Sequence, residues 1–181
     1  LIHGDLDRLL GHDAVESPLV LQLGGSQPDR LAWAVARAAP WGFAEINLNV
    51  GCPSDRVQSG KFGACLMAEP EVVAACCRAM MAETDLPVSV KCRIGIDDMD
   101  VETGLDRFVD TVAGSGVSVF YIHARKAWLN GLSPRENRII PPLDYERVRR
   151  LAKRRGDLTV ILNGGLKTAD QALAEMNGCN G

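Results

Sequence analysis

The stretch Glu45-Ile-Asn-Leu-Asn-Val-Gly-Cys-Pro-Ser54 joins a predicted strand to a sharp turn that presents one thiol. Asn47 and Asn49 place two amides in an otherwise apolar run, and a buried amide costs free energy unless it is hydrogen-bonded. The glycine before Cys52 permits a tight turn and the proline after it stiffens the exit. A Gly-Cys-Pro turn by itself is most often a turn with a free cysteine. Here the same design recurs at other strand ends, which favours a role in chemistry.

Five apolar runs alternate with amphipathic segments along the chain. Near-continuous apolar runs are typical of parallel strands covered on both faces, and strands that alternate with helices predict βαβ units. Leu105, Phe108 and Val112 follow helical spacing, and Pro28 suits the first turn of a helix over Asp29–Ala39. We therefore expect one α/β domain with a parallel sheet. The predicted strands are Leu19–Leu23, Ala44–Val50, Pro87–Arg93, Val117–Ala124 and Leu158–Asn163.

Polar residues and glycines gather at the carboxyl ends of these strands. In a doubly wound sheet such ends are spread along an edge, whereas in a (β/α)₈ barrel they converge on one mouth. We therefore predict the TIM-barrel type of α/β fold. Because a complete barrel takes about 250 residues, residues 1–181 are expected to form an incomplete barrel of about five central βα units, with two unpaired strand edges. The strand-end groups are Gln22 with Gly24-Gly25, Asn49 with Gly51-Cys52, Lys91 with Arg93, His123 with Arg125, and Asn163 with Gly164-Gly165.

Composition excludes several classes of protein. Hydrophobic residues make up 46% of the chain and the net charge is −3, which is typical of a globular protein and favours no particular partner. We expect no membrane segment and no secretory signal, because no apolar run approaches the roughly 20 residues of a membrane span. The six cysteines and three histidines show no ligand spacing. We expect reduced thiols, no bound metal and a cytoplasmic location.

Lys91 and His123 are the strongest candidates for chemistry among the charged strand-end residues. A lysine in an apolar strand is seldom buried without a partner. Lys91 is therefore a Schiff-base nucleophile, a donor to an anionic cofactor, or half of an ion pair in the barrel core. A histidine in such a strand is more often a satisfied core residue, but the level that His123 shares with Lys91 favours function. Gln22 and Asn163 offer uncharged amides that suit the edge of a heterocycle, and the Gly-Gly pair after Asn163 allows close approach of a ligand.

The segment Arg125-Lys-Ala-Trp-Leu-Asn-Gly-Leu-Ser-Pro-Arg-Glu-Asn-Arg138 is long for a connection after a barrel strand. Loops of this length are usually functional or disordered. The loop carries four basic residues against the single acid Glu136, and they flank Trp128. Basic side chains around an aromatic ring fit a phosphate backbone and an unstacked base, so the loop is a candidate RNA contact. The second basic run, from Arg147 to Arg155, is expected to be the solvated face of an outer helix.

Four motifs together resemble one family. Asn-Leu-Asn-Val-Gly-Cys-Pro-Ser, Val-Lys-Cys-Arg-Ile-Gly, the long basic loop and Leu-Asn-Gly-Gly are similar to motifs of the tRNA-dihydrouridine synthases, and the loop motif is similar to that of subfamily A. The resemblance extends from about residue 2 to residue 171. It implies an FMN-binding (β/α)₈ barrel followed by a separate helical domain for tRNA. It also implies that reduced FMN passes hydride to C6 of a D-loop uridine, at position 20 or 20a, and that NADPH reduces the flavin again.

The resemblance assigns roles to the strand-end groups of this chain. Cys52 would be the general acid that protonates C5 of the uracil, since a thiol is mainly protonated at neutral pH. A lysine near the N1/O2 side of the flavin would stabilise its anionic reduced form. The residues expected to bind FMN are Gln22, Lys91, His123, Asn163, Gly164 and Gly165, and those expected to contact tRNA are Asn49, Arg135 and Arg138.

The chain departs from the family pattern at both ends, and two other functions stay open. The first barrel strand, the Gly-Arg phosphate site and the C-terminal helical tRNA domain are absent, and residues 176–181 do not continue into the expected last strand, so we expect a partial copy. An FMN barrel that acts on a free pyrimidine, like a dihydroorotate dehydrogenase, would explain Cys52 and Lys91 but not the basic loop. The second alternative is an inactive barrel fragment that binds RNA or another chain.

Overall fold

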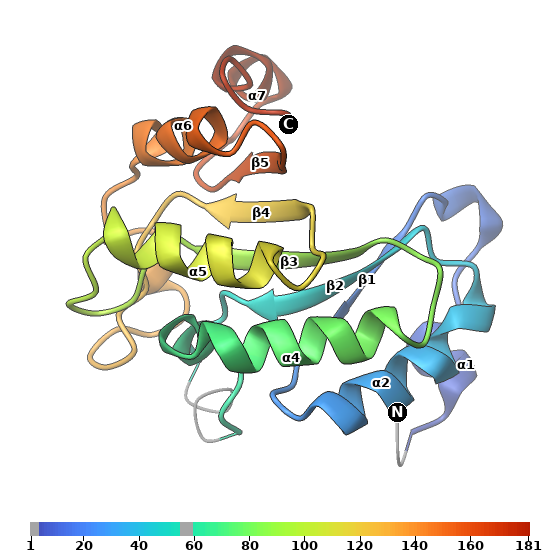
Figure 1. The fold of residues 1–181 in the computed structure, drawn as a ribbon. Helices are drawn as coiled ribbons and strands as arrows, with labels where there is room; N and C mark the ends of the chain where they lie inside the picture. Colours follow the sequence, from blue (N-terminus) through green and yellow to red (C-terminus); the bar gives the residue numbers. More distant parts are fainter. Residues whose placement is uncertain (1–3, 55–59) are drawn as a thin grey trace.

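The computed structural model describes residues 4–54 and 60–181, and its centre is one parallel sheet of five strands. The strands lie side by side in sequence order, β1-β2-β3-β4-β5 (Figure 1). Their bounds differ from the predicted ones by two residues at most. They are β1 Val20–Leu23, β2 Glu45–Val50, β3 Val88–Arg93, β4 Val119–His123 and β5 Thr159–Asn163.

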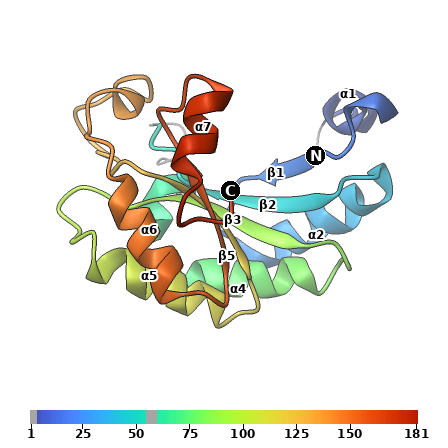
Figure 2. The same cartoon turned by 90° about the horizontal axis from the view of Figure 1, so that it is seen from above.

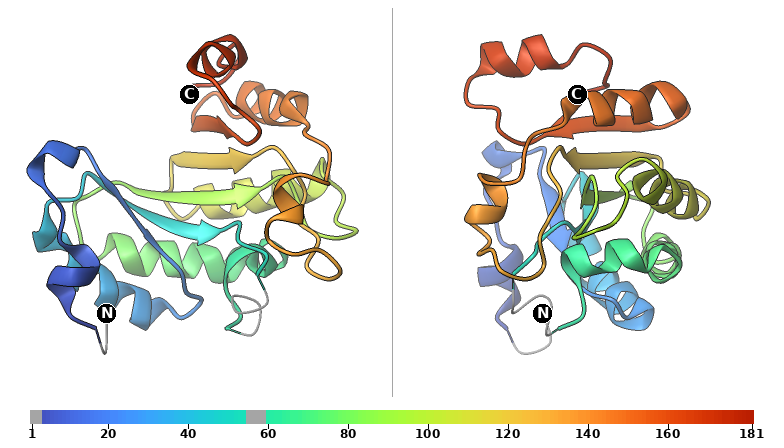
Figure 3. Two further views of the ribbon diagram at one scale, coloured as in Figure 1. Left: turned by 180° about the vertical axis from the view of Figure 1, so that it is seen from behind. Right: turned by 90° about the vertical axis from the view of Figure 1, so that its left-hand side faces the viewer.

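Four helices connect the strands and lie along one face of the sheet (Figure 2). They form an outer arc around the curved sheet when the molecule is viewed as in the right-hand panel of Figure 3. A doubly wound sheet reverses its strand order and carries helices on both faces, so this arrangement is that of a partial (β/α)₈ barrel, as predicted. The four helices are α2 Pro28–Ala38, α4 Pro70–Met81, α5 Thr103–Ala113 and α6 Tyr145–Arg154. The shorter elements are α1 Leu6–Leu10, η1 Ala14–Glu16, η2 Ala39–Trp41, η3 Gly63–Ala68, η4 Glu136–Arg138 and α7 Ala169–Glu175.

The hydrophobic core lies between these helices and the outer face of the sheet. The predicted stripe of α5 is buried in full, because Leu105, Phe108 and Val112 are 0% exposed. Pro28 occupies the first turn of α2, where its missing N–H costs no hydrogen bond. The outward-facing strand residues that complete the core include Ile46, Leu48, Val50, Val90, Cys92, Phe120 and Ile122.

The inner face of the sheet is polar. The expectation that the strands are apolar on both faces is wrong here, because successive side chains point to opposite faces and only the outer set is apolar. The strand register sorts the inner residues into rows. These rows are Gln22 with Asn47 and Ser89, Asn49 with Lys91, and Arg93 with His123 and Asn163.

The outer edge of β5 is partly covered, although we expected both sheet edges to be unpaired. The backbone N–H of Asn180 donates to Val160 O at 2.9 Å, and Leu162 N–H donates to Gly181 O at 2.7 Å. The C-terminal residues therefore lie beside β5 (Figure 1). β1 is the strand at the other edge of the sheet, and its hydrogen-bonded neighbour is β2.

The basic run of α6 forms an ion-pair network with α5. The expectation of a solvated helix face holds for Arg150, Lys153 and Arg154, which are exposed, but it is wrong for Arg147. Arg147 is 1% exposed, and its Nε donates to Val101 O at 2.7 Å. Its Nη2 lies 2.5 Å from Asp106 Oδ1. Arg154 and Arg155 both reach Asp110, at 2.9 Å and 2.6 Å. The helix α6 is thus fixed to α5 by charge as well as by its apolar stripe.

The sequence predicts that Cys65, Cys76, Cys77 and Cys92 are small hydrophobic residues without a chemical role; Cys76, Cys77 and Cys92 are buried, and Cys65 is half-buried. Burial raises the pKa of Cys76 to about 11 and the pKa values of Cys77 and Cys92 to about 12. These thiols therefore stay protonated at neutral pH, as small hydrophobic side chains of the core.

The described segments offer neither a membrane helix nor a metal site. None of the helices in residues 4–54 and 60–181 combines the length and the apolar character needed to cross a bilayer. Within the same residues, no group of three or more His, Cys, Asp and Glu side chains is placed to hold a metal ion.

Candidate active site at the strand ends

A cavity of about 200 Å³ lies at the carboxyl ends of β1 to β4 and beneath the long loop that follows β4. It gathers most of the side chains that we singled out in the sequence. The residues that line it are Gln22, Asn49, Gly51, Cys52, Pro53, Lys91, Arg93, His123, Pro134 and Arg138.

The Cys52 turn is held by hydrogen bonds on both sides. Asn49 Oδ1 accepts from the backbone N–H groups of Gly51 and Cys52, at 3.0 Å and 3.1 Å. The carbonyl oxygen of Cys52 accepts from Ala64 N–H at 2.9 Å. The thiol Sγ lies 3.5 Å from Ser54 Oγ. The amide oxygen of Asn49 therefore shapes the turn, and only its NH₂ group is left to reach a ligand.

Arg93 is a buried cation that sequence reasoning did not include among the site residues. It is 5% exposed and donates to three carbonyl oxygens, those of Gly51 at 3.2 Å, Lys126 at 3.4 Å and Asn137 at 2.9 Å. Burial lowers its pKa to about 10, so it remains charged at neutral pH. The signal was present, because Arg93 follows Lys91 by two residues and therefore lies on the same face of β3.

Lys91 extends from β3 to the end of β5, where its Nζ donates to Asn163 Oδ1 at 3.1 Å. Burial lowers the pKa of Lys91. Within the described residues it forms no ion pair with a carboxylate, so the reading of Lys91 as half of a core ion pair is not supported. Lys91 is thus a donor that faces the cavity.

His123 is held as a neutral imidazole. Burial, together with the cations Arg93, Lys91 and Arg125, lowers its pKa to about 3. Its Nε2 is buried and has no hydrogen-bond partner among the residues that the structure describes. A buried polar atom without a partner is costly, so this nitrogen is ready to bind a ligand.

The two glycines after β5 occupy positions where a side chain would not fit. Gly164 has φ +112° and Gly165 has φ +72°, conformations that side chains with a Cβ rarely adopt. A Cβ on Gly164 would lie 3.0 Å from the His123 ring. The carbonyl oxygen of Gly164 accepts from Tyr145 OH at 2.7 Å. Gly164 is therefore packed directly against His123, and Gly165 against Leu143 and Tyr145.

The basic residues of the long loop fall into two groups. Two of them donate hydrogen bonds to backbone carbonyl oxygens, and the other two are exposed. Lys126 Nζ donates to Met99 O at 2.8 Å, and Arg125 donates to Pro141 O. Arg135 and Arg138 are exposed, and Arg138 also lines the cavity that contains Cys52. The predicted RNA contacts are therefore the two arginines that do not support the loop.

Asn137, a second residue missed from the sequence, organises this loop from within. It is 0% exposed, and its Oδ1 accepts from Trp128 N–H at 2.8 Å. Its Nδ2 donates to Trp128 O at 2.9 Å. A single buried amide thus joins the two halves of the loop.

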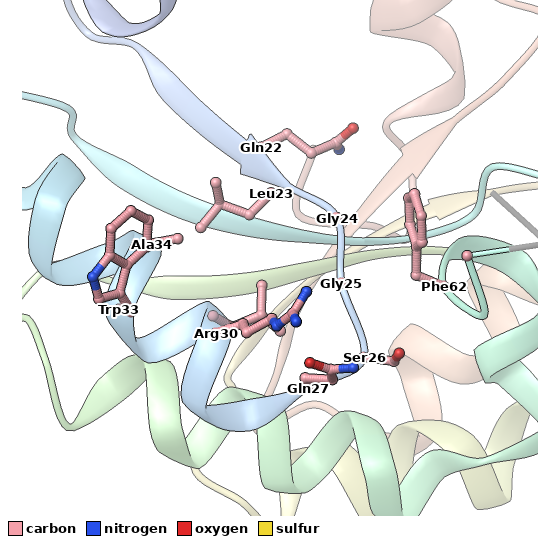
Figure 4. Close-up of a pocket in the computed structure, with 12 residues that line it drawn as sticks. Gln22, Leu23, Gly24, Gly25, Ser26, Gln27, Arg30, Trp33, Ala34 and Phe62 are labelled. Atoms are coloured by element: carbon pink, nitrogen blue, oxygen red, sulfur yellow. The ribbon is translucent and has the colours of Figure 1, made fainter. Parts of the chain in front are cut away.

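A larger cavity of about 430 Å³ lies beside the edge strand β1, between α2 and Phe62 (Figure 4). Gly24 lies so close to Phe62 that a Cβ would come within 2.9 Å of its ring. Figure 4 shows Gln22 and Leu23 leaving β1 on opposite sides. Because Gln22 lines both cavities, it stands at the boundary between them.

The fold and the site define a TIM-barrel protein whose strand ends present a thiol, several cations and a neutral histidine around one cavity. Barrel enzymes place their active sites at this end of the strands. Residues 5–181 match the family model described as "Dihydrouridine synthase (Dus)". The chain belongs to the dihydrouridine synthase family, which confirms the resemblance seen in its motifs.

Curated relatives agree with this family. The chain is 56% identical over 181 residues to "tRNA-dihydrouridine(20/20a) synthase" of Xanthomonas axonopodis pv. citri (strain 306), covering 100% of this chain and 54% of the relative. It is 54% identical over 171 residues to the protein of the same name from Synechocystis sp., covering 94% and 51%. The chain therefore spans about half the length of the curated relatives it matches. Residues 176–181, expected to leave the family pattern, lie inside the first alignment, so that expectation is wrong.

A solved structure supports the fold alone. The crystal structure of 2,3-dimethylmalate lyase, a PEP mutase/isocitrate lyase superfamily member, matches with a TM-score of 0.52. The sequence identity is 18%, and the match covers 96% of this chain and 57% of that one.

Proposed function

We propose that this chain supplies most of the catalytic barrel of an enzyme that reduces uridine to 5,6-dihydrouridine in the D-loop of tRNA, at positions 20 and 20a. FMN is the proposed cofactor, NADPH the reductant, and a separate helical domain the main tRNA-binding unit. The observation that carries the proposal is the fixed thiol of Cys52 in a cavity that also contains Lys91, Arg93 and His123. The family match and the names of the relatives support the substrate.

The groups around the cavity fit FMN. The unpartnered Nε2 of His123 needs a polar ligand, and Lys91 offers a cation to an electron-rich ring edge. The first glycine after β5 lies beside this histidine, because a Cβ on Gly164 would come within 3.0 Å of the His123 ring. The residues that would hold FMN are Gln22, Lys91, His123, Asn163, Gly164 and Gly165. Bound FMN supplies hydride to C6 of the uracil in its reduced form.

Lys91 would act electrostatically. Its ammonium group is positioned by Asn163, and burial strengthens its interaction with any negative charge that develops beside it. A fixed donor of this kind stabilises charge without the need to reorganise during the reaction. Lys91 is thus proposed as the residue that favours the reduced, anionic state of the cofactor.

Cys52 would supply the proton. Its turn is fixed by Asn49 on one side, and by Arg93 through the Gly51 carbonyl on the other, so the thiol has a constant position. A target base must leave its stack to reach this depth. The NH₂ group of Asn49 is available to donate to the flipped uracil, while the Cys52 Sγ proton passes to C5.

The proposal is tested with the protein at its natural length, expressed in a strain that lacks its own tRNA-dihydrouridine synthases. We expect the purified protein to show the visible absorbance of an oxidised flavin, and we expect dihydrouridine to return at tRNA positions 20 and 20a. A yellow protein that restores no dihydrouridine in tRNA would support the free-pyrimidine alternative. A colourless, inactive protein would support the inert barrel fragment.

Removal of two exposed arginines is expected to weaken tRNA binding. The double substitution Arg135→Ala with Arg138→Ala should reduce the slope of log affinity against log salt concentration by about two, one for each lost phosphate contact. FMN content should stay unchanged. A matched control is Arg37→Ala with Arg78→Ala, which removes the same charge from exposed positions on α2 and α4. An unchanged salt slope in the first variant would reject these arginines as backbone contacts.

A further inference from the structure

We propose that a hydrogen-bond chain beginning at Glu45 fixes the side-chain amide of Gln22 so that its carbonyl oxygen faces the ligand. Gln22 then recognises an imide N–H, the group that lies between two carbonyls in both the flavin and uracil rings. The inference rests on the proposed function and adds positioning roles for Glu45, Asn47 and Ser89.

The chain crosses three strands on the inner face of the sheet. Ser89 Oγ donates to Glu45 Oε1, and Asn47 Nδ2 donates to Ser89 Oγ at 2.7 Å. Gln22 Nε2 donates to Asn47 Oδ1 at 2.7 Å. Gln22, Asn47 and Ser89 are register partners on β1, β2 and β3, so the sheet itself holds them in line. Tyr121 OH also donates to Glu45, at Oε2 and 3.4 Å, but takes no part in the chain.

The direction of the chain follows from its charged end. A carboxylate accepts hydrogen bonds and donates none, so Ser89 uses its single proton on Glu45. The hydroxyl oxygen of Ser89 can then only accept, which turns the NH₂ group of Asn47 toward it. The carbonyl oxygen of Asn47 in turn requires the NH₂ group of Gln22. The Oε1 atom of Gln22 is what remains for the cavity.

Burial makes the alternative arrangement expensive. Asn47 is 3% exposed and Ser89 is 0% exposed. A flipped amide at Asn47 would set two acceptors against each other in a place that water does not reach, and an unsatisfied buried group loses its full solvation. Gln22 itself is exposed, so its orientation is determined by Asn47 and not by its own surroundings.

The acceptor Oε1 of Gln22 complements the hydrogen-bond donors that line the rest of the cavity. Lys91, Arg93 and Arg138 are all donors, and such donors suit the carbonyl oxygens of a flavin or a uracil. The N–H between those carbonyls needs an acceptor instead. Figure 4 shows the amide end of Gln22 directed away from α2.

The test compares FMN with N3-methyl-FMN, which lacks the imide N–H, in the protein at its natural length. Dissociation constants are measured by quenching of flavin fluorescence. We expect the unsubstituted protein to bind FMN about tenfold more tightly than the methylated analogue, the loss of one good hydrogen bond. Glu45→Gln has the same shape, but its NH₂ group can donate to Ser89 and reverse the direction of every hydrogen bond in the chain. The ratio of the two dissociation constants should then fall toward one.

The matched control is Tyr121→Phe, which removes the other hydroxyl that donates to the same carboxylate and should keep the tenfold ratio. Ser89→Ala interrupts the chain by a second route and should lose the ratio as Glu45→Gln does. If Glu45→Gln weakens both ligands equally, or if Tyr121→Phe also loses the ratio, the proposal is overturned.

Two further measurements test separately which ring carries the recognised imide N–H and whether the hydrogen-bond chain exists. If FMN and its methylated analogue bind equally while tRNA with 3-methyluridine at the target position binds more weakly than unmodified tRNA, the imide belongs to the base. Scalar coupling across the hydrogen bond between Gln22 Nε2 and the Asn47 side-chain carbonyl can be measured by NMR without any ligand. Its presence in a protein that binds no flavin would support the chain and refute the proposed function, whereas its absence would overturn the chain.

Discussion

Replacement of Cys52 by serine or alanine is expected to slow uridine reduction by a factor of about 10²–10⁴, the usual contribution of general acid catalysis. Reduction of the flavin by NADPH should stay near its normal rate. The reason is structural, because Cys52 is the cysteine that lines the strand-end cavity, and its turn is held by Asn49 and Ala64. The protonation of C5 has no other thiol at hand within the described cavity.

The two half-reactions are separated by single-turnover measurements, with NADPH alone and then with reduced enzyme and tRNA. Cys65→Ser is the matched control, since this half-buried thiol donates to Phe62 O and does not line the cavity. Its variant should keep both rates. An equal loss in both half-reactions for Cys52→Ala would mean that Cys52 serves flavin binding or folding.

Arg147→Ala is expected to lower the free energy of unfolding by about 3 kcal/mol. Breaking a buried ion pair typically costs 3–5 kcal/mol. The lower end applies because the acids that would be left behind, Asp106 and Glu102, have side chains that are 31% and 50% exposed and can be solvated. The carbonyl oxygen of Val101 would also lose its donor.

Urea denaturation of the protein at its natural length gives the measurement, with Arg150→Ala as the control. Arg150 also binds Glu102, at 2.5 Å, but its side chain is 52% exposed, so its loss should change stability by less than about 1 kcal/mol. If the two variants were equally stable, burial would not be what gives Arg147 its effect.

The sheet could be predicted from the sequence because its evidence is local. Each strand is a short apolar run that ends at a glycine or a charged residue, as in the segment from Glu45 to Cys52, and each helix shows its own stripe. The strand-end rule then placed Gln22, Cys52, Lys91 and His123 around one cavity, which the structure confirms.

The partners of buried polar residues could not be predicted, because they lie far away in the sequence. The sequence showed only that Asn47 needs hydrogen-bond partners. They are Gln22 and Ser89, which are 25 and 42 residues distant. Arg147 looked solvated because its partner Asp106 is 41 residues away on another helix. Such pairs depend on strand register and helix packing, and a short stretch of sequence predicts neither.

The three carbonyl oxygens that share the Arg93 guanidinium come from the Cys52 turn, the start of the long loop and its end. A lysine has one nitrogen and no planar fork, so it would not satisfy the same three oxygens. Arg93 therefore joins the loop and the turn through one side chain. Under the proposed function, the distance between the loop arginines that contact the RNA backbone and the Cys52 thiol is constant. Only a flipped base that spans this distance would reach the thiol.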